Sequence, residues 1–83
     1  MTISADDVRR LLQDEHPDAV LVLIEGRTEV IGQSETESPQ YRGALQVISR
    51  DDLLQQIGGQ DLSDRLIEEQ ATILDTTVNE LGG

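Results

Sequence analysis

The sequence has no cysteine, lysine, phenylalanine or tryptophan, and Tyr41 is its only aromatic residue. Without cysteine, the chain can form no disulfide bond, thiolate-bound zinc site or dithiol redox centre. Without phenylalanine and tryptophan, aliphatic side chains have to form nearly all of the core. A chain of 83 residues is too short to bury two cores, so we expect a single domain, residues 1–83.

Positive charge is scarce: six arginines stand against 17 acidic residues, which gives a net charge of −11. Binding to nucleic acid or to an anionic membrane needs a basic surface, so neither partner is expected. The acidity has three explanations: solubility through self-repulsion, adaptation to the high-salt cytoplasm of halophilic microbes, or mimicry of nucleic acid. In the last case the chain would inhibit a basic nucleic-acid-binding protein.

Long apolar runs are also missing. No stretch approaches the roughly 18 residues that cross a bilayer. The N-terminal segment, MTISADD, is polar and acidic, whereas a signal peptide is basic and then apolar. The sequence therefore predicts a cytoplasmic protein.

Two segments carry the same signals for the start of a helix. In ISADDV, Ser4 can cap a helix, and Asp7 follows three residues later, which is the spacing of a capping box. ISRDDL repeats the arrangement from Ser49 onwards. We therefore expect helices over residues 5–15 and 50–57.

Residues 19–24, AVLVLI, form an unbroken apolar run, whereas a strand with one solvent-facing side alternates between apolar and polar residues. The run predicts a strand that is buried on both faces. Gly26 in EGRT predicts a type II′ hairpin turn to a second strand, residues 28–34. A polar loop, SETESPQY, precedes a third predicted strand over residues 42–48.

The last segment predicts the longest helix, residues 62–81. Its apolar residues recur at spacings of four and three and so form a stripe along one side of the helix: Ile67, Ala71, Leu74, Val78 and Leu81. The predicted order is one helix, three strands and two helices. This is an α+β fold built on a small three-stranded antiparallel β-meander.

The predicted strand over residues 19–24 needs cover on both faces. The first two helices can cover one face, and the last helix can cover the other face in the same chain or in a second copy. We favour a homodimer, because the last helix carries more apolar surface than a small sheet can cover. The alternative is a monomer with helices on both sides of the sheet.

No motif for catalysis, a cofactor or a metal ion stands out. His16 is the only histidine, and it lies at the end of a predicted helix, where the helix dipole favours a partly charged imidazole. The sequence has no glycine-rich phosphate loop, no calcium-binding loop and no recognisable pairing of a nucleophile with a base. We therefore expect a protein that is not an enzyme and that binds no cofactor, metal ion or small molecule.

The polar loop holds the residues best suited to recognition. Tyr41 and Arg42 are of the residue types that most often anchor protein interfaces. The alternative is that Tyr41 begins the third strand and lays its ring over the edge of the sheet.

The sequence ends in Gly82–Gly83. In this it resembles ubiquitin-like modifiers and sulfur carriers, whose terminal glycine carboxylate is activated as an adenylate. The resemblance implies a carrier whose glycine tail leaves a β-grasp sheet as an extended arm. Here the two glycines follow a predicted helix, where glycine is also a common terminating residue.

The main functional hypothesis is a small, acidic, non-catalytic protein-interaction module that associates first with itself. Its predicted contact residues are those of the apolar stripe together with Tyr41 and Arg42. The alternatives are the nucleic-acid mimic and the Gly-Gly carrier.

Overall fold

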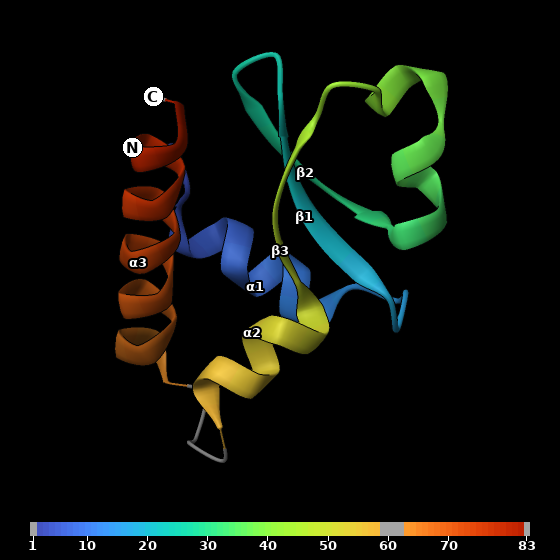
Figure 1. Cartoon of the computed structure of the whole chain (residues 1–83). Helices are drawn as coiled ribbons and strands as arrows, with labels where there is room; N and C mark the ends of the chain where they lie inside the picture. The colour runs from blue at the N-terminus through green and yellow to red at the C-terminus, as the bar shows by residue number, and fades with distance from the viewer. Residues whose placement is uncertain (1, 59–62, 83) are drawn as a thin grey trace.

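The computed structural model describes residues 2–58 and 63–82, and within them the predicted α+β fold is confirmed. One helix is followed by three strands and two further helices, with two short 3₁₀ helices between the second and third strands (Figure 1). The elements are α1 (Ala5–Gln13), β1 (Ala19–Ile24), β2 (Arg27–Gly32), η1 (Gln33–Glu37), η2 (Pro39–Tyr41), β3 (Leu45–Ser49), α2 (Arg50–Ile57) and α3 (Asp64–Gly82).

The three strands form one antiparallel sheet in the order β2-β1-β3. This order corrects the predicted β-meander, in which β2 would be central and β3 would pair with β2. β3 pairs with β1 instead, because the connection through η1 and η2 crosses to the other side of β1. β1 is therefore the central strand, and its unbroken apolar run is buried on both faces, as predicted.

The turn between β1 and β2 differs from the predicted one by a single position. Glu25 and Gly26 both have positive φ, 51° and 79°, and Ile24 pairs with Arg27 across them. The turn is therefore type I′, centred on Glu25–Gly26, and the predicted type II′ turn is wrong. A type I′ turn matches the right-handed twist of the two strands, which offsets the cost of a left-handed backbone at Glu25.

Both predicted helix starts are confirmed, with one difference. The Ser4 side chain accepts a hydrogen bond from the Asp7 N–H, and the Asp7 carboxylate accepts one from the Ser4 N–H. At α2, Ser49 accepts from the Asp52 N–H at 3.1 Å. Ser49 is also the last residue of β3, paired with Val20, and within the described residues only this half of the second capping box forms.

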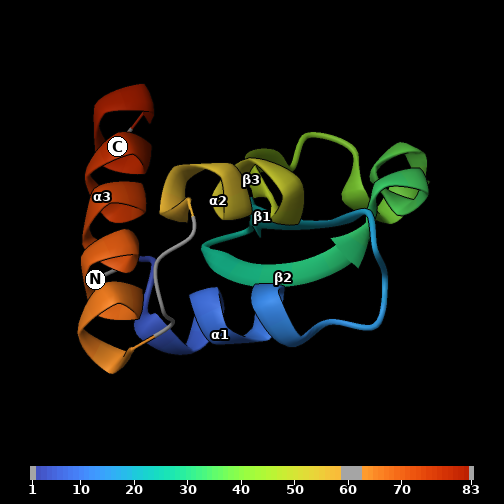
Figure 2. The ribbon, with the colours of Figure 1, turned by 90° about the horizontal axis from the view of Figure 1, so that it is seen from below.

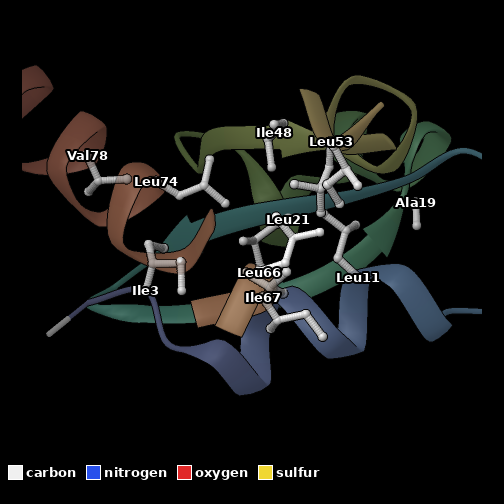
Figure 3. Packing of buried hydrophobic residues seen from close by; sticks show 13 residues of the cluster. Ile3, Leu11, Ala19, Leu21, Ile48, Leu53, Leu66, Ile67, Leu74 and Val78 are labelled. Atoms are coloured by element: carbon white, nitrogen blue, oxygen red, sulfur yellow. The ribbon is translucent and has the colours of Figure 1, made fainter. Parts of the chain in front are cut away.

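The sheet has a hydrophobic cluster on each face. Figures 1 and 2 show α3 on one side of the sheet and the η1–η2 connection on the other. The larger cluster packs the sheet against all three α-helices (Figure 3); it includes Ile3, Leu11, Leu21, Ile48, Leu53, Ile67 and Leu74. The smaller cluster contains Val20, Val22 and Ile31, with Tyr41 and Ala44 packed against it.

A single chain therefore covers both faces of β1. The sequence-based alternatives assigned the second face to a helix, either of the same chain or of a second copy. The η1–η2 connection covers that face instead, and all three α-helices contribute to the cluster on the other face.

β3 pairs with β1 through a β-bulge. Leu21 pairs with Ile48 and Val22 pairs with Gln46, which leaves Val47 as an extra residue in β3. In a regular strand, neighbouring side chains point to opposite faces. Here Val47 and Ile48 both pack against the helical cluster, so two apolar side chains of β3 lie on the side of the sheet that α3 covers.

Candidate interaction surface

The predicted contact stripe on α3 packs inside the chain. Four of its residues expose at most 8% of their surface and belong to the helical cluster: Ile67, Ala71, Leu74 and Val78. Leu81 lies in α3, but its side chain is outside the described residues. The prediction set this stripe against the sheet or against a second copy, whereas α1 of the same chain also packs along α3.

Tyr41 and Arg42 lie on the opposite side of the sheet from α3, because both belong to the η1–η2 connection. The Tyr41 ring packs against the smaller cluster, and its hydroxyl donates to Glu29 Oε1 at 2.9 Å. Tyr41 therefore covers the second face of the sheet, although it lies in η2 and not in β3. Arg42 is exposed. The predicted contact residues thus do not form one continuous surface.

Hydrogen bonds join the η1–η2 connection to β2 through a small charged cluster. The Tyr41 hydroxyl and then the Arg27 guanidinium lower the pKa of Glu29, while the bond to Glu29 raises the pKa of Tyr41. Arg27 donates through Nε to Glu29 at 3.0 Å and through Nη1 to Glu25 at 3.1 Å. These contacts join the first half of β2 to the hairpin turn through Glu25 and to the η1–η2 connection through Tyr41.

A groove of about 470 Å³ opens where β3, α2 and α3 meet. Figure 1 shows α3 beside β3, with α2 following directly from the lower end of β3. We call this hollow the β3–α3 groove; its lining residues are Val47, Ile48, Asp52, Gln55, Gln56, Ile73, Leu74 and Thr77. An edge strand and two helices therefore border a common hollow.

Ile73 is the exposed apolar residue of this groove. Half of its surface, 51%, is accessible, more than for any other large apolar residue in the described chain. A second hollow, of about 550 Å³, also borders Ile73, and the described residues that line it all belong to α3: Arg65, Glu68, Glu69, Thr72 and Ile73. The described chain gives that hollow one wall and the β3–α3 groove two walls, so the groove is the better candidate for holding a partner.

β3 borders the groove as an edge strand. It pairs with β1 on one side, and no strand of the described chain pairs with its other side. Its five residues, LQVIS, carry no charge. Natural edge strands usually carry charged residues or are covered, because an open edge offers unpaired N–H and C=O groups to another chain.

The described residues that line the groove carry a negative charge. Asp52 is the only charged residue among those that line it. Four of the arginines pair with carboxylates elsewhere in the described chain: Arg9 with Asp6 and Asp64, Arg10 with Asp7, Arg27 with Glu25 and Glu29, and Arg65 with Glu69. Together with the net charge of −11, this arrangement attracts a cationic partner.

The two alternative functions gain no support from the arrangement of their residues. The described acidic residues are spread over α1, the α1–β1 loop, the hairpin, η1, α2 and α3, whereas a nucleic-acid mimic needs them in an ordered row. Gly82 is the last residue of α3, and Gly83 is outside the described residues. A carrier of the ubiquitin-like kind presents both glycines on an extended arm.

Within residues 2–58 and 63–82, no group of three acidic or histidine side chains is placed to hold a metal ion. None of the helices in those ranges combines the length and the apolar character needed to cross a membrane. No family model, curated protein or solved structure matches this chain. Its function therefore has to be inferred from the geometry of its own surface.

Proposed function

We propose that this chain is a non-catalytic protein-interaction module that binds a partner protein in the β3–α3 groove. The observation that carries the proposal is the pairing of an open, uncharged strand edge with a half-exposed Ile73 on the facing helix. An open strand edge offers unpaired backbone N–H and C=O groups to another chain, and Ile73 adds apolar contact beside that edge.

A second copy of the chain is the alternative occupant. The homodimer was expected because β1 and the α3 stripe needed cover, and the chain supplies that cover itself. Each copy also carries a net charge of −11, so repulsion opposes self-association at low salt and weakens when salt screens the charges. We therefore favour a different protein that presents a basic surface.

Two serine variants test the proposal. Ile73 and Leu54 are both exposed apolar residues on helices, with 51% and 41% of their surfaces accessible, but only Ile73 lines the groove. Wild type and the Leu54→Ser variant should retain the same protein from an extract of the host, and Ile73→Ser should lose it. Far-ultraviolet circular dichroism should show equal helix content for all three proteins.

Sedimentation velocity at low and high salt distinguishes a second copy from a different protein. A dimer that forms in high salt with wild type and Leu54→Ser, but not with Ile73→Ser, would identify the second copy as the occupant. If Ile73→Ser sediments like wild type and retains every protein that wild type retains, the groove is not the binding site and the proposal is wrong.

A further inference from the structure

We propose that the partner enters the β3–α3 groove as an extended segment that adds to the open edge of β3 and directs a cationic side chain towards Asp52. This inference rests on the proposed function and states how the partner is recognised. It follows from three features of the groove: the backbone of β3, the length of the edge, and the charge of the lining.

The backbone of β3 favours a strand over a helix as the occupant. On an edge strand, alternate residues direct their N–H and C=O groups away from the sheet. A helix in the groove would shield these groups from water without pairing them, which costs free energy. An extended segment pairs them and at the same time places every second side chain against α3. Those side chains would contact Ile73 and Thr77.

The length of β3 limits the segment to about five residues. β3 itself has five residues, which at about 3.3 Å per residue extend over roughly 16 Å. The bulge at Val47 bends this edge and interrupts its regular pairing. A long flat edge of another sheet, including that of a second copy, therefore fits poorly, whereas a short flexible segment can follow the bend.

The lining of the groove defines the chemistry of the segment. Val47, Ile73 and Leu74 offer apolar contact, and Gln55 and Gln56 offer neutral polar groups. Asp52 is the only charged lining residue, and it is exposed at the first turn of α2. A segment that alternates apolar residues with an arginine or lysine is complementary to this set, and the net charge of −11 speeds its approach.

The probe is a displayed library of five-residue segments that alternate Val, Ile or Leu with Arg or Thr, selected on wild type and in parallel on Ile73→Ser. The best binder is then synthesised in three forms: unmodified, N-methylated on its odd residues, and N-methylated on its even residues. N-methylation removes the hydrogen-bond donor and leaves the side chains and the charge unchanged. In a strand that adds to β3, only one of the two sets of amides faces β3.

One methylated form should therefore bind about 10- to 100-fold more weakly than the parent, because it loses two or three backbone hydrogen bonds. The other methylated form should bind within about twofold of the parent. Asp52→Asn should weaken arginine-containing peptides about two- to fivefold, as expected for an exposed ion pair. Asp51→Asn, a neighbour that does not line the groove, should leave the affinity unchanged.

The possible results separate the two proposals. If both methylated forms bind as tightly as the parent while Ile73→Ser abolishes binding, the groove binds proteins but not by strand addition, and this inference alone is overturned. If the peptide binds Asp51→Asn and Asp52→Asn equally weakly, the cation is held by the general acidity of the chain and not by Asp52. If no segment is enriched on wild type over Ile73→Ser, both this inference and the proposed function are overturned.

Discussion

The two edges of the sheet differ in how they are protected. β2 carries Arg27 and Glu29, which join Glu25 in a charged cluster, and its Thr28 hydroxyl donates to the buried Asp7 carboxylate of α1 at 2.7 Å. β3 carries no charged residue and borders the groove. Charged residues on an edge strand prevent pairing with other chains. The β2 edge is therefore protected against pairing with another chain and the β3 edge is not, which supports the proposal that a partner binds at β3.

The largest effect is expected on the free energy of unfolding, when the buried and the exposed isoleucine of the β3–α3 groove are compared. Ile48 exposes 8% of its surface and Ile73 exposes 51%. Ile48→Ala should lower the free energy of unfolding by about 2–5 kcal/mol, as for other buried large-to-small changes. Ile73→Ala should change it by no more than about 0.5 kcal/mol. Urea unfolding measures both, and equal losses would show that Ile73 belongs to the core and is not kept for a partner.

A second comparison concerns the acidic cap residues of the helices beside the two edges. Asp7 is buried and accepts hydrogen bonds from the Ser4 N–H, the Thr28 hydroxyl and Arg10. Asp7→Ala should cost about 1–3 kcal/mol of the free energy of unfolding. Asp52→Ala should cost about 0.5 kcal/mol, from the helix dipole, because its exposed carboxylate accepts no hydrogen bond from the described residues. Similar losses for the two variants would contradict the expectation that Asp7 stabilises the fold through its hydrogen bonds and that Asp52 does not.

The contribution of Asp7 should also depend on pH. Burial alone would raise the pKa of Asp7, but hydrogen bonds from Ser4 and Thr28 and the bond and charge of Arg10 outweigh it and lower the pKa below 3.8. A group with a lowered folded pKa stabilises the fold fully above its unfolded pKa and loses this effect as pH falls through the folded pKa. The difference between wild type and Asp7→Ala should therefore be constant from pH 7 to about 5 and shrink below about pH 4.

Tyr41→Phe should have a smaller effect. It removes the hydroxyl that donates to Glu29 at 2.9 Å and leaves the ring on the second face of the sheet. We expect a loss of about 0.5–1.5 kcal/mol, the usual net value of one hydrogen bond, towards the lower end because Tyr41 is partly exposed. A double-mutant cycle with Glu29→Gln measures the coupling, and additive losses would show that the bond does not join the connection to β2.

The smallest expected effect is at His16, which lies against the last residue of β2, Gly32. The hydrogen bond to Asp14 at 2.7 Å raises the pKa of His16, and the carboxylates of Glu35 and Asp18 add to the effect. A raised folded pKa means that His16 stabilises the fold below its ordinary pKa of 6.5 and loses this effect as pH rises through the folded pKa.

Wild type should therefore unfold at a slightly lower urea concentration at pH 8.5 than at pH 6, and His16→Gln should show a smaller change between these pH values. An NMR titration of the imidazole gives the folded pKa directly. A value at or below 6.5 would show that the carboxylates of Asp14, Glu35 and Asp18 do not raise the pKa of His16.

Local signals in the sequence predicted most of the fold. The capping serines Ser4 and Ser49 marked the starts of α1 and α2, and the apolar run of residues 19–24 marked β1 as a strand that is buried on both faces. The order of the strands depends on which side of β1 the η1–η2 connection reaches. That choice is made by tertiary packing of Tyr41 and Ala44 on the smaller cluster, and no local pattern encodes it.

The groove was harder to predict than the fold. The α3 stripe indicated an apolar face correctly, but the sequence does not show whether α1 or a second copy covers it. The position of Ile73 beside the stripe gave no usable signal of its exposure, because Leu66 lies seven residues earlier on the same side of α3 and exposes 7% of its surface, against 51% for Ile73. Val47 gave none either, since its place in the groove depends on the bulge in β3.

An NMR titration of the ¹⁵N-labelled chain with the selected five-residue peptide tests the open edge most directly. If β3 is the binding edge, amide shifts change at Leu45–Ser49 and at Ile73 and Thr77, while the amides of Arg27–Gly32 keep their positions. Shift changes along β2, or changes that follow the acidic residues over the whole surface and leave β3 unaffected, would contradict this account.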